Sequence, residues 1–256
     1  MAADNDSLIH AASAGDLDRL RTLLAADKEP TQDTIHALRT AAVKGLQLDI
    51  MDYLLSQYPG VPLDEEVVRA AINTGSVPIL QALLARDPSC ANMQFDRRGT
   101  PLVVACMGQQ SIAYLQCLLE AGADPNQDPD AAAYPLALVA ALYRDTAAID
   151  LLLQHGARLE NSGALAAAAQ RGNEPMLCHL MARGARSDSD AATATTTPPL
   201  HVAVGAGHAG AARILLQHGA DANVRNSAGN RAMDVALAMQ SKGKDTSEVL
   251  KVLEES

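Results

Sequence analysis

Residues Leu200–Asn223 read LHVAVGAGHAGAARILLQHGADAN, and this stretch decides the fold because the chain repeats its pattern. A helix of small residues is followed by a short break, a Leu-rich helix and the pair Gly-Ala. The same order occurs in LVVACMGQQSIAYLQCLLEAGADPN at Leu102–Asn126, in LALVAALYRDTAAIDLLLQHGAR at Leu136–Arg158 and in LAAAAQRGNEPMLCHLMARGAR at Leu165–Arg186. Such self-similarity is the signature of a repeat architecture.

The Leu-rich segments recur at a nearly constant interval along the chain. The second residue of the apolar pair in each segment falls at Leu24, Leu55, Leu84, Leu119, Leu153, Met181 and Leu216. Six intervals separate residue 24 from residue 216, so their mean is 32 residues. A unit this short cannot bury its apolar face alone, and its stability must come from packing against neighbouring units.

The composition agrees with stacked helices and excludes a disordered chain. Of the 256 residues 48% are hydrophobic and 20% are charged, but Trp is absent, Phe occurs once and Tyr five times. A single globular core usually draws much of its buried area from aromatic residues. This chain must instead bury Ala, Leu and Val in thin layers.

The charge balance argues against nucleic acid and membranes as partners. Thirty acidic residues outnumber 20 basic ones, for a formal net charge of −10, which repels phosphate backbones and anionic lipid. No apolar run approaches the roughly 20 residues that a membrane helix needs, and the N-terminal residues lack the pattern of a signal peptide. We therefore expect a soluble protein of the cytoplasm or nucleus.

Two stretches of the chain carry near-complete copies of a known motif. The pattern resembles the ankyrin repeat, whose period is about 33 residues and whose order is G-x-T-P-L-H-x-A-A, Gly-His and then L-L-x-x-G-A-D-x-N. One copy matches at Gly99, Thr100, Pro101, Leu102, Ala105, Leu118, Leu119, Gly122, Ala123, Asp124 and Asn126. The other matches at Pro199, Leu200, His201, Ala203, Gly207, His208, Leu215, Leu216, Gly219, Ala220, Asp221 and Asn223.

The resemblance implies an all-α fold, an ankyrin-type helical repeat solenoid whose helix-turn-helix units are joined by turn or hairpin loops. We expect about eight units in a single solenoid over residues 1–256. Its parts are an N-terminal cap at about 7–28, six internal repeats at 34–228 and a C-terminal cap at 229–256. Tetratricopeptide repeats are the less favoured alternative, since their Trp and aromatic positions are missing.

Local signals place the ends of the helices. Thr100 is positioned to cap a helix that starts at Pro101, where the missing N–H of proline costs nothing. Four glycines that follow the Leu-rich helices should adopt the left-handed conformation that ends a helix; they are Gly122, Gly156, Gly184 and Gly219. The units around Leu55, Leu119 and Leu153 hold one extra residue in the break, so we expect adjusted turns there.

The chain carries few signs of catalysis or metal binding. His155 and His218 end Leu-rich helices, where a cation favours the helix dipole, and His201 and His208 fit pattern positions that orient turns. The four cysteines, Cys90, Cys106, Cys117 and Cys178, have no zinc-like spacing, and we interpret them as reduced thiols that fill the core. We predict no catalytic residues, no metal and no cofactor.

The ankyrin resemblance implies a non-enzymatic protein–protein interaction module, a scaffold or adaptor that binds a protein through its concave groove and loop tips. Aromatic residues and Arg dominate interface energetics. The predicted binding residues are Phe95, Arg97, Arg98, Gln109, Tyr134, Tyr143, Arg144 and Arg171. Inward packing of Phe95 or Tyr143 is the competing interpretation. The alternative functions are an enzyme or small-molecule binder with a pocket in the groove, and a subunit that hides an apolar strip in an oligomer.

Overall fold

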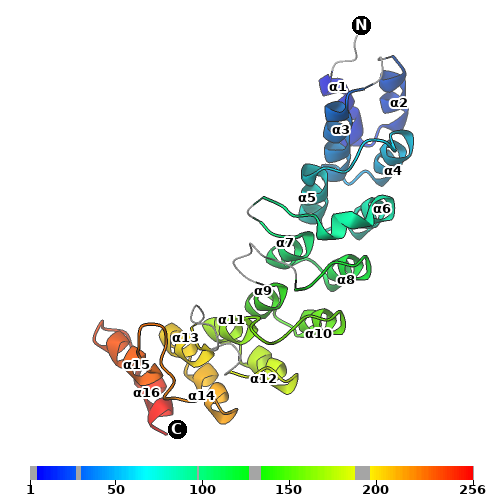
Figure 1. Cartoon of the computed structure of the whole chain (residues 1–256). Coiled ribbons are helices and arrows are strands. Elements are labelled where there is room, and N and C mark those ends of the chain that lie inside the picture. The colour runs from blue at the N-terminus through cyan, green and yellow to red at the C-terminus, as the bar shows by residue number, and fades with distance from the viewer. Residues whose placement is uncertain (1–4, 27–29, 97, 127–133, 188–196, 256) are drawn as a thin grey trace. The chain divides into compact units, whose positions relative to one another are not determined.

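The computed structural model describes residues 5–26, 30–96, 98–126, 134–187 and 197–255. These residues form sixteen α-helices and one 3-10 helix and no strand, which confirms the all-α prediction. They belong to two compact units, Met1–Asp124 and Pro125–Ser256, and each unit contains four helix pairs (Figure 1). The division into caps and internal repeats of one continuous solenoid stays a prediction.

The first unit contains α1–α8 and the 3-10 helix η1. Their bounds are α1 Asn5–Ala14, α2 Leu17–Ala26, α3 Gln32–Lys44, α4 Leu48–Gln57, α5 Glu65–Thr74, α6 Val77–Arg86, η1 Pro88–Asn92, α7 Pro101–Met107 and α8 Ile112–Glu120. The first helices of the pairs pack in the order α1, α3, α5 and α7, and the second helices α4, α6 and α8 pack beside one another. Each repeat is thus stabilised by its neighbours.

The second unit contains α9–α16. Their bounds are α9 Pro135–Leu142, α10 Ala147–Gln154, α11 Ala164–Arg171, α12 Glu174–Ala182, α13 Pro199–Ala206, α14 Ala209–Gln217, α15 Ala232–Gln240 and α16 Ser247–Glu254. The first helices again pack in sequence order, α9 on α11, α11 on α13 and α13 on α15. The seven apolar pairs found in the sequence all lie in second helices.

Helix ends follow the signals in the sequence. The Thr100 side chain accepts a hydrogen bond from the Val103 N–H at 3.4 Å, and Pro101 is the first residue of α7, as predicted. Asp64 caps α5 in the same way, accepting from the Val67 N–H at 3.0 Å. All four predicted glycines adopt a positive φ, with Gly184 at 98° and Gly219 at 89°.

The extra residues predicted in two of the breaks take a strained backbone conformation. After α3 the chain continues through Gly45 to Leu46, whose φ is 58°, and after α7 it continues through Gly108 to Gln109, whose φ is 50°. A left-handed backbone is costly for residues with a Cβ atom. In the shorter breaks a glycine takes this conformation directly after the helix, as Gly75 does with φ 66°.

A polar side chain next to each of three breaks reaches back to the preceding repeat. The Gln110 Nε2 donates to the Ile72 carbonyl oxygen at 2.7 Å, and the His208 Nε2 lies 3.2 Å from the Gln170 carbonyl oxygen. These bridging side chains are Gln47, Gln110 and His208, and they cover Gly15, Gly75 and Gly172. A Cβ atom at any of the three glycines would collide with them.

Asparagine side chains connect successive repeats at the opposite end. The Asn92 amide donates to the Gly122 carbonyl oxygen at 2.7 Å and accepts from the Asp124 N–H at 2.9 Å. Asn126 makes the same pair of bonds to Gly156 and Arg158, each at 2.9 Å. One side-chain amide thereby satisfies a backbone donor and a backbone acceptor of the next repeat. These two bonds fix the distance between the successive repeats.

Candidate functional site

In the first unit, the turn that carries Phe95 and Arg98 is held by its own backbone. The Phe95 N–H donates to the Gly99 carbonyl oxygen at 2.8 Å, and the Arg98 N–H donates to the Phe95 carbonyl oxygen at 3.2 Å. The Phe95 side chain is only 4% exposed, so it supports the turn from inside, whereas Arg98 is exposed. Arg97 lies outside the described residues.

Gln109, the other predicted residue of the first unit, lies at the far end of the same repeat. It is exposed and occupies the strained position after α7. The helix α7 has seven residues and separates the Phe95 turn from Gln109 by about 10 Å. The structure therefore places these predicted residues at the two ends of one repeat.

In the second unit, Tyr134 lies just before α9 at the mouth of a surface pocket. Its side chain is 44% exposed. The pocket has a volume of about 280 Å³, and its lining residues are Pro125, Asn126, Tyr134, Leu136, Arg158, Glu160, Asn161 and Ser162. Asn126 and Ser162 are occupied by hydrogen bonds to backbone atoms.

Tyr143, Arg144 and Arg171 gather at the opposite end of the helices. Tyr143 follows the last residue of α9 and is half-buried, whereas Arg144 and Arg171 are exposed. Because α9 and α11 pack side by side and are both first helices of their repeats, their C-terminal ends lie on the same side. The structure thus brings the end of α9 that leads into Tyr143 and Arg144 close to the end of α11 that carries Arg171.

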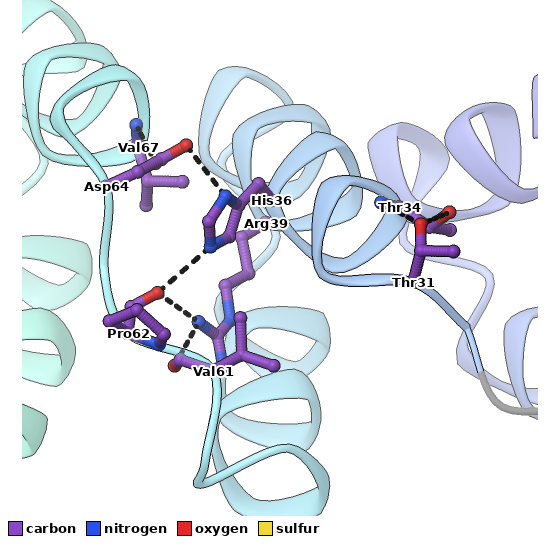
Figure 2. Close-up of polar contacts among 8 residues, drawn as sticks. All are labelled: Thr31, Thr34, His36, Arg39, Val61, Pro62, Asp64 and Val67. Atoms are coloured by element: carbon purple, nitrogen blue, oxygen red, sulfur yellow. Dashed lines mark hydrogen bonds and ion pairs between the residues drawn. The ribbon is translucent and has the colours of Figure 1, made fainter.

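A buried polar cluster in the first unit was not predicted from the sequence. Arg39, in α3, is fully buried. Its Nη1 donates to the carbonyl oxygens of Val61 at 3.0 Å and Pro62 at 3.2 Å, and its Nη2 donates to that of Tyr58 at 2.9 Å. Figure 2 shows the guanidinium directed at the chain segment that joins α4 to α5.

His36 extends this cluster by one turn of α3. Its Nε2 lies 3.1 Å from the Pro62 carbonyl oxygen, and its Nδ1 lies 3.1 Å from a carboxylate oxygen of Asp64 (Figure 2). The same Asp64 caps α5, so the cluster connects α3 to the start of the next repeat. Burial lowers the pKa of Arg39, and the nearby charge of Arg86 lowers it further. These contacts hold α3 against the segment that leads into α5.

One comparison within the chain could have revealed Arg39. It lies six residues before Gly45, as Leu102 lies six residues before Gly108. An Arg where another repeat has a core Leu is a buried cation, and a buried cation requires acceptors. In this protein the acceptors are carbonyl groups after α4, which is followed by Tyr58 instead of by a Gly-Ala pair.

Burial of two thiols removes them as nucleophiles. It raises the pKa of Cys106 to about 12 and, with the nearby charge of Asp87, that of Cys90 to about 11. The thiolate is the nucleophilic form, so both thiols are unreactive near neutral pH. Cys178 differs from the expected core position because it is exposed on α12.

Several other features describe what the chain offers to ligands. A second pocket, of about 460 Å³, lies along α14 and α16 and includes Arg213 and Asn223.

Among the described residues no group of three or more His, Cys, Asp or Glu could hold a metal ion. Within the same part of the chain, the helices are too short or too polar to cross a membrane.

Comparisons with known proteins agree with this geometry. Residues 165–254 match the family model of ankyrin repeats, in three copies. The crystal structure of the human ASB11 ankyrin repeat domain is similar to this chain with a TM-score of 0.54 at 20% sequence identity. The alignment covers 97% of this chain and 96% of that one. No curated protein matches the sequence.

The two comparisons cover different shares of the chain. The family model matches α11–α16 of the second unit, where the copy with Leu200 and Gly219 keeps the pattern best. The structural similarity extends over nearly all residues and shows a common fold. Together they confirm the helical repeat architecture predicted from the sequence.

Proposed function

Because residues 165–254 match the ankyrin repeat family and nearly the whole chain shares the fold of an ankyrin repeat domain, we propose that the protein binds a protein partner without catalysis, as a scaffold or adaptor. Ankyrin repeats are generally protein–protein interaction modules. In each unit the proposed binding residues lie at the ends of first helices and at loop tips. They are exposed Arg98 and Gln109 in the first unit, and exposed Tyr134, Arg144 and Arg171 with half-buried Tyr143 in the second.

One observation supports this proposal most directly. Arg144 and Arg171 are both exposed at the same end of two packed helices, with Tyr143 beside them. Arg and Tyr are enriched among residues that carry binding energy. The packed layers below hold the backbone of these residues in place. Binding a partner therefore costs little backbone entropy at this site.

The experiment compares three versions of the full chain in affinity capture from lysate of the source cell. They are the native chain, a variant with Arg144→Ser and Arg171→Ser, and a control with Arg213→Ser. Arg213 is also an exposed Arg of the second unit, but it lies on α14, a second helix. We expect a protein that the native chain and the control retain and the double variant loses. Identical captured proteins for all three chains would contradict the proposed surface.

A further inference from the structure

Two large apolar side chains of the first unit are exposed at the ends of its first helices. Leu46 is 57% exposed and Met107 is 56% exposed. Leu46 follows α3, and Met107 is the last residue of α7. Since α3, α5 and α7 pack in sequence order, with contacts joining their corresponding ends, Leu46 and Met107 lie at the same end of the stack, two layers apart.

The backbone at Leu46 gives a reason to regard this exposure as functional. Its φ of 58° is uncommon for Leu, whereas Gly or Asn adopts this conformation readily. The chain therefore carries an exposed apolar side chain at a position where a small polar residue would be more stable. Strained residues of this kind gather at functional sites.

The turn between these two positions is short and polar. The helix α5 ends at exposed Asn73 and half-buried Thr74, and Gly75 takes the left-handed conformation without an inserted residue. Among the described residues of the first unit, the exposed large apolar side chains lie in or directly before the longer turns that follow α3 and α7. The apolar pair is thus interrupted by one layer that can offer hydrogen bonds.

The charge of the first unit indicates the sign of the partner. Residues 1–124 contain 16 Asp and Glu against nine Lys and Arg, a formal net charge of −7. A cationic segment is attracted by this negative field. The attraction raises the rate of association and stabilises the complex. An acidic segment or a nucleic acid would be repelled.

We propose that Leu46 and Met107 form a docking surface for a basic, extended peptide segment of a partner protein, with two apolar side chains that contact them. Packed helix layers are roughly 10 Å apart, so the two contacts are about 20 Å apart. An extended chain advances about 3.3 Å per residue, which separates the two apolar residues of the peptide by about six positions. Methionine adapts to different apolar partners. This proposal goes beyond the function proposed above: it adjoins Gln109 at the end of α7, but it names two apolar side chains that are not among those binding residues.

The probe is the fluorescein-labelled peptide KLKSKSKLK, whose two Leu are six positions apart, titrated with the full chain in a fluorescence anisotropy experiment. One control peptide has Ser in place of both Leu, and another has Glu in place of every Lys. We expect binding of the first peptide, at least tenfold weaker binding of the Ser peptide and no binding of the Glu peptide.

The matching protein variants are Leu46→Asn with Met107→Gln, and Leu237→Gln as the control, because Leu237 is 49% exposed on α15 of the second unit. We expect at least a tenfold loss of affinity in the double variant and no change in the control. The double variant should melt at or above the native temperature, since Asn tolerates the left-handed backbone. Equal affinity of the Leu and Ser peptides, equal affinity of native chain and double variant, or absence of binding would each overturn the proposal. The variants at Arg144 and Arg171 test the other surface separately.

Discussion

The guanidinium of Arg39, in α3, caps the end of α4 in the same repeat: its Nη2 donates to the carbonyl oxygen of Tyr58, the residue after α4, at 2.9 Å. The last carbonyl groups of a helix have no partner within the helix. In other repeats a left-handed glycine and the following residue supply donors. Here a side chain from α3 replaces them, and Arg39 also binds the carbonyl oxygens of Val61 and Pro62.

Replacing Arg39 by Ala should therefore destabilise the first unit strongly. The substitution removes the Arg39 donor from three carbonyl oxygens, of which those of Tyr58 and Pro62 keep one other partner each, and it opens a cavity; we expect a loss of about 3 kcal/mol in the free energy of unfolding. Urea denaturation measures it. The control is Arg19→Ala, since Arg19 is exposed on α2 and should change stability by less than about 0.5 kcal/mol. Equal effects of both substitutions would contradict the role assigned to Arg39.

Removing one of the asparagine connections should weaken the contact between two repeats. We expect Asn126→Ala to destabilise the second unit by about 1.5 kcal/mol, because the Gly156 carbonyl oxygen and the Arg158 N–H lose their shared partner. Hydrogen exchange at the Arg158 amide should accelerate. Asn73→Ala, at an exposed helix position, is the control, and unchanged exchange at Arg158 in the Asn126 variant would refute the expectation.

Glycine should have opposite effects at two neighbouring positions. Gln109→Gly should raise stability by about 0.5 kcal/mol, because Gly adopts the φ of 50° without strain. Gln110→Gly should lower stability by about 1 kcal/mol, because the 2.7 Å bond to the Ile72 carbonyl oxygen is lost. Thermal melting of the two variants gives the signs; a lower melting temperature for Gln109→Gly would contradict the strain at Gln109, and an unchanged or higher one for Gln110→Gly would contradict the role of its bond.

The thiols should differ in reactivity according to burial. In native protein at pH 8, iodoacetamide should modify exposed Cys178 and leave Cys106 and Cys90 unmodified until urea is added. Burial holds the pKa of Cys106 at about 12, above the value of about 8.5 in an unfolded chain. The folded state therefore retains a proton that the unfolded state releases, and stability should fall as pH rises above about 8.5. Mass spectrometry of the labelled peptides checks the order of modification.

The helix ends and the repeat could be predicted because their causes are local in the sequence. Thr100 and Pro101 start a helix wherever they occur before an apolar run, and Gly219 ends one because it tolerates a positive φ. The extra residue in the breaks was also visible from counting, and it lies at Leu46 and Gln109. These features need no knowledge of distant residues.

The features that sequence reasoning missed depend on distant parts of the chain. Arg39 is stable in the core only because three carbonyl groups beyond α4 converge on it. The sequence left exposure and inward packing of Phe95 as alternatives, and only the packed structure, in which the side chain is 4% exposed, distinguishes them. The binding roles of Arg98, Tyr134, Arg144 and Arg171 remain predictions, because exposure alone does not select a partner.

Because of the bridging side chains, the position of a first helix in the stack does not depend on the length of the turn that follows it. Gln110 follows a long turn and His208 a short one, yet each contacts the first helix of the preceding repeat. A residue inserted before such a side chain, as Leu46 is before Gln47, leaves that contact in place. New sequence can therefore accumulate at this edge during evolution, or be added by an engineer, while the helices beneath keep their spacing.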